Sequence, residues 1–251
     1  MSTRRTERNS PYNLFGKEYA DQRLSGGMLF NDYIEAPVVR GLLSRAAMSS
    51  GSRALDIGCG PGIYTRAILE LGASVTAIDS SAVMLQAARN HCSTIPNIAN
   101  LCTFVQQPFE DFDLHNQSFH LILATFMLSY FEDLQATLSR MRRALTSEGR
   151  IITSMLHPVR MFATDRTRDG YITGDYFQGG HYTADFLDQS SPLQLRRYNF
   201  EQIHDCANNA GLSITQLLEP SADVNCTFHD REKVRFYSHN PSILVLEMKS
   251  K

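Results

Sequence analysis

Residues 54–62 read ALDIGCGPG, and this stretch decides the fold. Its first four residues are mostly apolar and end abruptly at glycine-rich residues, a pattern that predicts a buried strand followed by a tight turn. Pro61 suits the first turn of a helix, and apolar residues then recur at helical spacing up to Gly72. The stretch therefore predicts a strand, a glycine turn and a helix in succession.

The same unit recurs further along the chain. Residues 74–78 form a second apolar, β-branched run that ends at Asp79, and Ser80 or Ser81 can cap the helix that follows. The remaining apolar runs and stripes predict strands at 101–105, 119–124 and 150–155, with a helix between 131 and 145. Alternation of strands and helices predicts a parallel sheet with helices on both faces.

The alternation of predicted strands and helices ends after residue 156. Residues 158–197 are rich in Asp, Gly, Tyr and Thr without a sustained period, and they predict a long irregular segment with a functional role. Regular structure is expected again as a helix at 199–210 and strands at 213–218 and 243–248. Because only a polar loop precedes the last strand, we expect that strand to be antiparallel.

Composition limits the classes of function. The 251 residues, 43% of them hydrophobic, fit a single domain over residues 1–251. Lys and Arg number 24 against 26 Asp and Glu, so no positive field would attract nucleic acid. No run of about 18 apolar residues is present, so no membrane association and a cytoplasmic location are expected. Five scattered cysteines without a C-x-x-C pair predict neither disulfides nor a metal site.

The glycine turn predicts a ligand. Glycines let the backbone approach a ligand closely, and free N–H groups at the start of a helix attract an anion. A dinucleotide site needs G-x-G-x-x-G, but Ile63 stands where the third glycine would be, so NAD fits poorly. Asp56, two residues before the first glycine, would face a cationic ammonium group. A zwitterionic amino-acid tail therefore fits better than a pyrophosphate.

Residues 55–62, LDIGCGPG, resemble motif I of the class I S-adenosylmethionine-dependent methyltransferases. Residues 118–124 and 145–150 are similar to the fourth strand of that family and to the turn before its fifth strand. The resemblance covers roughly residues 12–249. It implies an α/β, doubly wound, mostly parallel seven-stranded Rossmann-like sheet with a final antiparallel strand and an insertion after the fifth strand. It also implies S-adenosyl-L-methionine as the cofactor.

The resemblance further implies a set of cofactor contacts. Asp79 corresponds to the acid that takes both ribose hydroxyls, although it could instead be only a helix N-cap. Pro108 stands near the position of the family's usual adenine-binding acid, so Glu110 or Asp111 substitutes, or Phe109 holds the adenine by its backbone and by packing. The expected cofactor-binding residues are Tyr19, Arg23, Asp56, Gly58, Cys59, Gly60, Asp79, Ser80, Met84, Phe109, Glu110 and Ala124.

Several of these residues also have a purely structural interpretation. Residues 1–45 resemble the lid helices of the family, in which Tyr19 and Arg23 would share a face and Arg23 could pair with the cofactor carboxylate. An amphipathic helix packed on the core is equally compatible with this pattern. Asp56 could cap the turn that follows it, and Met84 could fill the core rather than contact adenine.

Methyl transfer from a sulfonium needs few catalytic groups, because the donor is already activated and chiefly has to be aligned. A hydroxyl acceptor needs a base, whereas a neutral amine does not. His157 follows the fifth strand, at the edge where open α/β sheets bind ligands, and is the predicted base or substrate contact. Its alternative role is to fix the backbone before Pro158. The expected substrate contacts are Tyr12, Tyr171, Tyr176 and His181.

These observations predict a methyltransferase that acts on nitrogen or oxygen of a small molecule, with a natural product or another metabolite as the favoured acceptor. The His157-Pro158 pair resembles a bacterial small-molecule group, and the insertion at 158–197 is expected to bind the acceptor. The alternatives are an RNA or protein acceptor, and a cofactor-binding protein of the same fold without transfer. The sequence leaves open whether the chain forms a homodimer.

Overall fold

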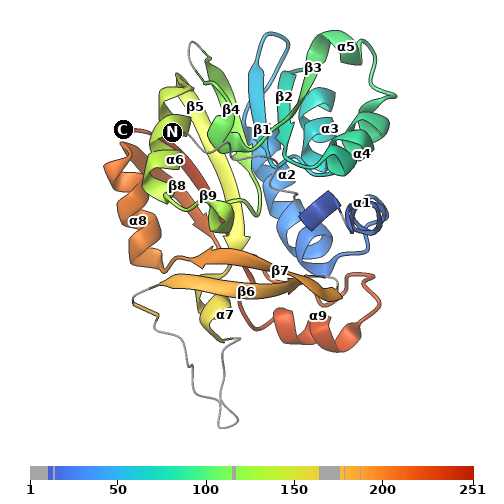
Figure 1. Ribbon diagram of the computed structural model, residues 1–251, viewed down its shortest axis with the longest axis vertical. Coiled ribbons are helices and arrows are strands. Elements are labelled where there is room, and N and C mark those ends of the chain that lie inside the picture. The colour runs from blue at the N-terminus through green and yellow to red at the C-terminus, as the bar shows by residue number, and fades with distance from the viewer. Residues whose placement is uncertain (1–10, 14, 115–116, 164–175, 178, 187) are drawn as a thin grey trace, which may run out of the picture.

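The computed structural model describes residues 11–13, 15–114, 117–163, 176–177, 179–186 and 188–251. These residues contain a seven-stranded sheet with the order β3-β2-β1-β4-β5-β9-β8 (Figure 1). The strands span β1 Arg53–Ile57, β2 Ser74–Asp79, β3 Cys102–Gln106, β4 Phe119–Ala124, β5 Leu145–Leu156, β8 Leu212–Leu218 and β9 Ile243–Ser250. Strands β1 to β5 pair in parallel, whereas β9 is antiparallel to β5 and β8. The expected doubly wound sheet with an antiparallel final strand is confirmed.

Helices cover both faces of this sheet. The first face carries α2 Ala36–Arg45, α3 Ile63–Glu70, α4 Ala82–Cys92 and the short α5 Ile98–Leu101, and the second carries α6 Leu134–Arg143 and α8 Phe200–Asn209. Strand β4 shows why both faces are covered: Leu121 and Leu123 pack on the first side, and Ile122 and Ala124 on the second. Burial of each leucine-sized side chain contributes about 1.5–3 kcal/mol, so both layers stabilise the sheet.

The carboxyl ends of the parallel strands meet at one edge, which positions the candidate site. Two N-terminal elements, α1 Gly16–Leu24 and η2 Leu29–Glu35, lie at this edge (Figure 1). The short helices nearby are η1 Pro11–Asn13, η3 Phe109–Asp111 after β3 and η4 Leu128–Tyr130 after β4. Helix α1 packs on α4, so the N-terminal segment reaches across to the second β-α unit.

The expectation of an irregular segment at 158–197 was wrong for the described part of it. Helix α7 spans Pro158–Ala163, and strands β6 Gly180–Phe186 and β7 Asp188–Arg197 form a two-stranded antiparallel ribbon. The ribbon lies outside the central sheet, beyond the end of β5 (Figure 1). Its strands pair with each other from Gly180↔Arg197 onward. A ribbon held by its own backbone hydrogen bonds does not need the alternating apolar pattern that marks a sheet strand.

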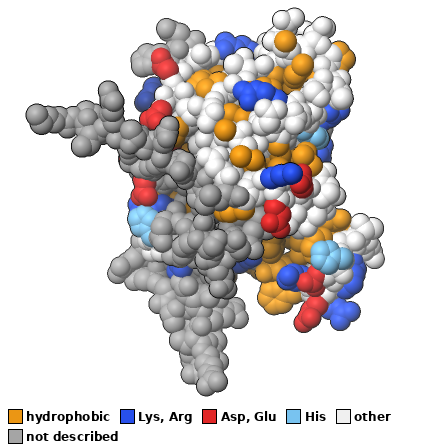
Figure 2. Space-filling model, turned by 45° about the vertical axis from the view of Figure 1, so that its right-hand side comes forward, with side chains coloured by type: hydrophobic (Ala, Val, Ile, Leu, Met, Phe, Trp, Pro, Cys, Tyr) orange, Lys and Arg blue, Asp and Glu red, His pale blue; other side chains and the backbone are white. Residues whose placement is uncertain are grey.

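A second correction concerns the loop before β9. Helix α9, Arg231–Tyr237, interrupts the stretch expected to be a polar loop, and Asp230 caps it by accepting a hydrogen bond from the Lys233 N–H. The helix buries Val234 but leaves Phe236 54% exposed, and apolar side chains show at this corner of the surface (Figure 2). With a single buried residue, α9 lacks the apolar stripe that reveals a helix in sequence. Among the described residues, no helix is both long and apolar enough to cross a membrane.

Candidate functional site

The glycine turn between β1 and α3 is the first component of the site. Its three glycines, Gly58, Gly60 and Gly62, all have positive φ angles. A Cβ atom on Gly60 would meet no heavy atom within 4 Å, so the space beside it is free of protein. A Cβ atom on Gly58 would instead overlap the side chain of Met127, which follows β4. The space beside Gly60 is thus open, whereas the Met127 side chain fills the space beside Gly58.

Asp79, at the end of β2, joins two turns. The backbone N–H of Gly60 donates to its Oδ2 atom at 2.9 Å, and the N–H of Ser81 donates to Oδ1 at 2.8 Å. Ser81, and not Asp79, caps α4, because the N–H of Met84 donates to the Ser81 hydroxyl. Each carboxylate oxygen retains a lone pair beyond these bonds. Burial raises the pKa of Asp79, and the backbone hydrogen bonds from Ser81, Gly60 and Ser80 oppose that rise.

Asp56 is buried at the end of β1, with 1% of its surface exposed. Its Oδ2 atom accepts a hydrogen bond from the Thr65 hydroxyl at 2.6 Å, which ties β1 to the first turn of α3. Burial raises the pKa of Asp56 to about 7, and the Thr65 hydrogen bond opposes that rise only in part. The structure supports the turn-holding role, and contact with a ligand ammonium stays a prediction.

Glu35 is a buried acid that sequence reasoning missed. It is fully buried at the end of η2, where its carboxylate accepts hydrogen bonds from the Tyr64 hydroxyl at 2.7 Å and from the Ser154 hydroxyl. The Ser154 oxygen in turn accepts from the N–H of Phe126 at 2.9 Å. Phe126 has a φ of 56°, a left-handed conformation that costs energy for a residue other than glycine. Glu35 thereby links the N-terminal segment to the residue before Met127.

Substituting Glu35 by glutamine is expected to flatten the pH dependence of stability. Burial raises the pKa of Glu35 to about 7, so the folded protein keeps a proton that the unfolded chain releases above about pH 4.3. The free energy of unfolding therefore falls as the pH rises towards 7, by at most roughly 1.4 kcal/mol per pH unit for this group. Urea denaturation of Glu35→Gln at pH 5, 6 and 7 should show a smaller fall than wild type.

A matched control for this experiment is Glu70→Gln. Glu70 is half exposed and pairs with Arg66 on the surface of α3, so its substitution should leave the slope unchanged. Asp56 keeps a residual slope of the same sign in the Glu35 variant, because burial also raises its pKa. An unaltered slope in Glu35→Gln would show that Glu35 is already ionised in the folded protein.

The N-terminal segment meets this edge through aromatic contacts. The Tyr12 ring lies 5.3 Å from the Tyr19 ring, centroid to centroid, and the hydroxyls of Tyr12 and Tyr130 are 2.8 Å apart. A Cβ atom on Gly16 would come within 2.9 Å of the Met84 side chain, so Met84 packs directly beneath α1. The predicted contacts Tyr12 and Tyr19 of the N-terminal segment and Met84 of α4 therefore lie where this segment packs on α4.

Arg23, predicted to pair with a cofactor carboxylate, has a protein partner. It is 6% exposed and forms an ion pair with Asp32 of η2. Asp32 also accepts a hydrogen bond from the Met28 N–H, which closes the turn between α1 and η2. In this structure Arg23 holds α1 to η2, which corresponds to the helix-packing interpretation of the sequence.

The other predicted cofactor residues are divided between core and surface. Phe109 is buried, its ring lies 5.9 Å from that of Phe131, and the Arg140 guanidinium lies over it. Glu110 and Ser80 are exposed. The buried remainder comprises Ala124, whose carbonyl accepts from the Thr153 hydroxyl, and Cys59, whose thiol pKa is raised well above its usual value by burial.

His157 is buried, and both of its ring nitrogens have partners. The N–H of Val159 donates to Nδ1 at 3.2 Å, and Nε2 lies 2.6 Å from a carboxylate oxygen of Glu219. With Nδ1 accepting, the ring proton lies on Nε2 and is donated to Glu219. This geometry fixes the start of α7, which was the structural alternative for His157. Its catalytic role stays a prediction.

The predicted substrate contacts have different surroundings in the structure. His181 in β6 is exposed, with Nε2 3.3 Å from the carboxylate of Glu132. The Tyr176 carbonyl accepts a hydrogen bond from the side chain of Asn199, which caps α8. Tyr171 lies outside the described residues. Tyr12, through Tyr130, and His181, through Glu132, both contact the loop between β4 and α6.

The central part of the chain has known relatives. Residues 55–153 match the family model described as a methyltransferase domain, and this range contains the glycine turn, Asp79 and strand β4. Residues 55–153 are therefore similar to methyltransferase domains.

Two curated proteins are similar to part of this chain. The demethylmenaquinone methyltransferase of Tropheryma whipplei (strain Twist) is 38% identical over 117 residues, which cover 46% of this chain and 47% of that protein. The mitochondrial ubiquinone biosynthesis O-methyltransferase of Schizosaccharomyces pombe is 30% identical over 107 residues, covering 43% and 39%. The matches span about half or less of the length of these relatives.

A solved structure shows the same fold. The crystal structure of a putative S-adenosylmethionine-dependent methyltransferase from Listeria monocytogenes has a TM-score of 0.69 at 22% identity, over 84% of this chain and 97% of the other. The carboxyl edge of the sheet fits S-adenosylmethionine in two respects. The space beside Gly60 is open, and the Gly60 backbone is bonded to the carboxylate of Asp79.

Proposed function

We propose that this protein transfers a methyl group from S-adenosylmethionine to an oxygen or nitrogen atom of a small-molecule acceptor. The observation that carries the proposal is that Asp79 holds the glycine turn through Gly60, where an added Cβ atom would meet no heavy atom within 4 Å. A carboxylate with free lone pairs suits the ribose hydroxyls, and open backbone suits the amino-acid tail. A small-molecule acceptor, no nucleic-acid partner and a cytoplasmic location belong to this proposal.

A ring of quinone type is the acceptor class that we favour. The two partial relatives are named for demethylmenaquinone and for ubiquinone biosynthesis, and the second name specifies an O-methyltransferase. The phenol groups of Tyr12 and Tyr130 meet at the carboxyl edge of the sheet, beside the loop after β4. Aromatic side chains of this kind suit a flat, partly polar ring. The name of the second relative is the reason that we favour oxygen as the receiving atom.

The chemistry requires little from the protein beyond alignment. The bound cofactor supplies an activated methyl group, and the surrounding residues hold donor and acceptor in line and exclude water. Asp79 holds the glycine turn, and the Glu35–Ser154 hydrogen bond holds the strained Phe126 backbone next to Met127. A ring hydroxyl becomes a better nucleophile when a base removes its proton.

The proposal is tested by release of S-adenosylhomocysteine with defined acceptors. Purified protein is incubated with S-adenosylmethionine and a hydroxylated quinol, an aromatic amine, bulk RNA or no acceptor. Release that depends on the quinol supports the proposal, whereas release only with RNA supports the alternative acceptor class. Tight S-adenosylhomocysteine binding without release for any acceptor would show a cofactor-binding protein that does not transfer.

His157→Ala separates the two roles of His157. The variant loses a helix-capping contact and the Glu219 hydrogen bond, so we expect about 1–3 kcal/mol less unfolding free energy. If His157 is the base for a hydroxyl acceptor, its loss also lowers the turnover of the folded enzyme by about 10²–10⁴-fold and leaves the affinity for S-adenosylhomocysteine unchanged. Glu219→Gln is the control, because an amide oxygen can still accept from Nε2. Full turnover of folded His157→Ala would remove His157 from the catalytic site.

A further inference from the structure

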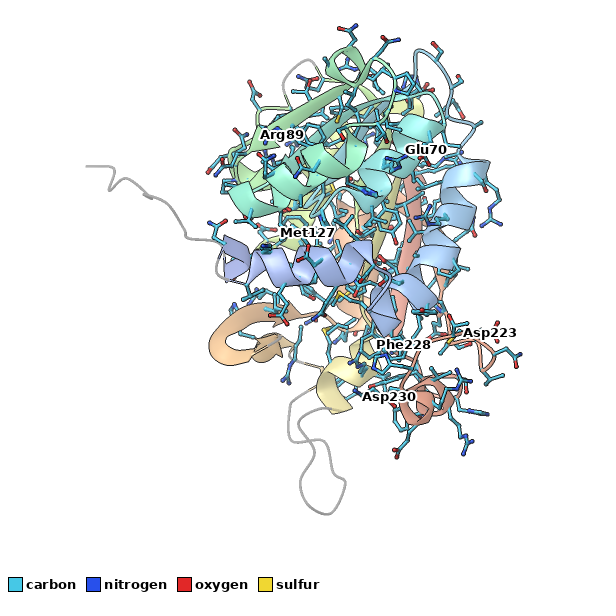
Figure 3. All side chains as sticks on the ribbon, turned by 90° about the vertical axis from the view of Figure 1, so that its right-hand side faces the viewer. Glu70, Arg89, Met127, Asp223, Phe228 and Asp230 are labelled. Carbon is cyan, nitrogen blue, oxygen red and sulfur yellow. The ribbon has the colours of Figure 1, made fainter. Side chains whose placement is uncertain are left out.

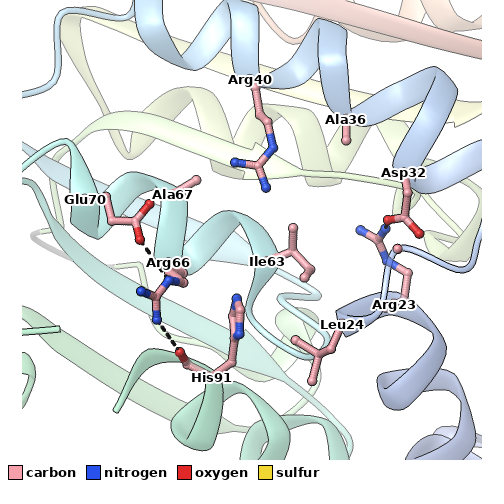
Figure 4. Close-up of a pocket in the computed structure, with 11 residues that line it drawn as sticks. Arg23, Leu24, Asp32, Ala36, Arg40, Ile63, Arg66, Ala67, Glu70 and His91 are labelled. Atoms are coloured by element: carbon pink, nitrogen blue, oxygen red, sulfur yellow. Dashed lines mark hydrogen bonds and ion pairs between the residues drawn. The ribbon is translucent and has the colours of Figure 1, made fainter. Parts of the chain in front are cut away.

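A cavity of about 350 Å³ lies between α1, α2, α3 and α4 (Figure 4). The residues that give it charge are Arg23, Arg40, Arg66, Asp32, Glu70 and His91. None of residues 56–62 lines it, and neither does Asp79. The cavity is therefore separate from the space beside Gly60 where we place the cofactor.

Two of the three arginines in this cavity are already paired. Arg23 pairs with Asp32, and the Nε atom of Arg66 lies 2.8 Å from Glu70. The Nη1 atom of Arg66 donates to the carbonyl of His91 at 2.7 Å. These bonds occupy the Nε and Nη1 atoms of Arg66. Its Nη2 atom has no acceptor among the described residues.

Arg40 is the unpaired charge. It extends from α2 towards Arg66 and His91 (Figure 4), and it forms no hydrogen bond or ion pair with a described residue. The lining therefore carries three guanidinium groups against two carboxylates, in a chain whose formal net charge is -2. A cavity with a local positive excess in an acidic protein favours an anion.

The pKa of His91 depends on the charges that line this cavity. Its pKa is lowered, first by burial and then by the charges of Arg66 and Arg40, while Glu70 opposes them. Arg23 from α1 and Asp32 from η2 complete the charged groups around the cavity. An anion placed between the arginines would reverse their effect on the imidazole and raise its pKa.

Apolar side chains line the rest of the cavity. Leu24 of α1, Ala36 of α2, and Ile63 and Ala67 of α3 face the same space. The volume exceeds that of a bare oxyanion, so a small organic group attached to the anion can pack against these side chains. An occupant would touch all four helices and would hold α1 against the core.

We propose that this cavity binds a phosphate group, with Arg40 and the free Nη2 atom of Arg66 as its donors. Guanidinium groups match the geometry of phosphate oxygens and bind them through charge-assisted hydrogen bonds. The shared chemistry is a dianionic phosphate, either inorganic phosphate or a small phosphate monoester. The proposal is independent of methyl transfer and of the acceptor.

Nuclear magnetic resonance of the imidazole nitrogens tests this proposal on the full chain. Inorganic phosphate and glycerol 3-phosphate are titrated separately into wild-type protein while the pKa of His91 is followed. We expect both ligands to raise this pKa, and tighter binding of the monoester would assign the apolar lining to its organic part. Equal affinities would assign the site to free phosphate.

Two variants with opposite expected effects complete the test. Arg40→Gln should weaken phosphate binding by roughly tenfold or more, whereas Glu70→Gln should strengthen it because Arg66 loses its carboxylate partner. Arg45→Gln is the matched control, since Arg45 is exposed on the same helix and does not line the cavity. Circular dichroism checks that each variant is folded. No phosphate-dependent change at His91, or equal affinity in Arg40→Gln and wild type, would overturn the proposal.

Discussion

Replacing Asp79 by alanine is expected to weaken the binding of S-adenosylhomocysteine by at least roughly 100-fold. The carboxylate is proposed to accept hydrogen bonds from both ribose hydroxyls, and each charge-assisted bond contributes about 1.5–3 kcal/mol. The substitution also removes the acceptor for the N–H groups of Gly60 and Ser81, which lie 2.9 Å and 2.8 Å from it. The glycine turn then keeps the bond from the Cys59 N–H to the Ile78 carbonyl of β2 but loses the one from Gly60, so cofactor binding is weakened through direct and indirect effects.

Isothermal titration calorimetry with S-adenosylhomocysteine measures this loss directly. Asp79→Asn is the matched comparison, because its remaining oxygen accepts one hydrogen bond, and its effect should lie between wild type and alanine. Thermal unfolding checks that both variants are folded at the titration temperature. Wild-type affinity in folded Asp79→Ala would show that the ribose is held elsewhere.

The sheet was predictable from sequence because its signals are local. Strand β4 spans the predicted residues 119–124, and the glycine turn follows β1 at the expected position. Buried parallel strands read as apolar runs, and the turn needs glycine because its backbone adopts positive φ angles. The ribbon β6–β7 carries no such signal, since its strands pair with each other outside the sheet.

The buried polar contacts could not be predicted, because their partners are distant in sequence. Glu35 bonds Tyr64 and Ser154, which are 29 and 119 residues away. A glutamate among apolar neighbours, as in residues 33–39, YIEAPVV, is the signal that indicates a buried acid. It does not indicate which groups satisfy that acid. The same limit applies to His157, whose partner Glu219 follows it by 62 residues.

Met127 shows how a residue without a motif can shape the candidate site. Its side chain, labelled in Figure 3, lies against Gly58. Its backbone follows Phe126, which is held through Ser154 and Glu35. The contact joins the loop after β4 to the glycine turn. The N-terminal segment thereby supports the geometry of the turn through Glu35 as well as through the packing of α1.

Gly60→Val is expected to abolish S-adenosylhomocysteine binding while the protein stays folded. Gly60 has a φ of 54°, so a side chain there costs about 1–2 kcal/mol of backbone strain or somewhat more for a β-branched residue. The space that the valine would enter contains no protein atom within 4 Å of the new Cβ, so no clash with the core adds to this cost. We assign that space to the amino-acid tail of the cofactor, and the valine would fill it.

Gly51→Val separates backbone strain from loss of the binding space. Gly51 has a φ of 92° and also no neighbour within 4 Å of an added Cβ, but it precedes β1 at the amino end of the sheet. Both variants should therefore lose a similar amount of unfolding free energy, measured by urea denaturation. Only Gly60→Val should lose S-adenosylhomocysteine binding in calorimetry. Retained binding in Gly60→Val, or equal loss in Gly51→Val, would place the cofactor away from the glycine turn.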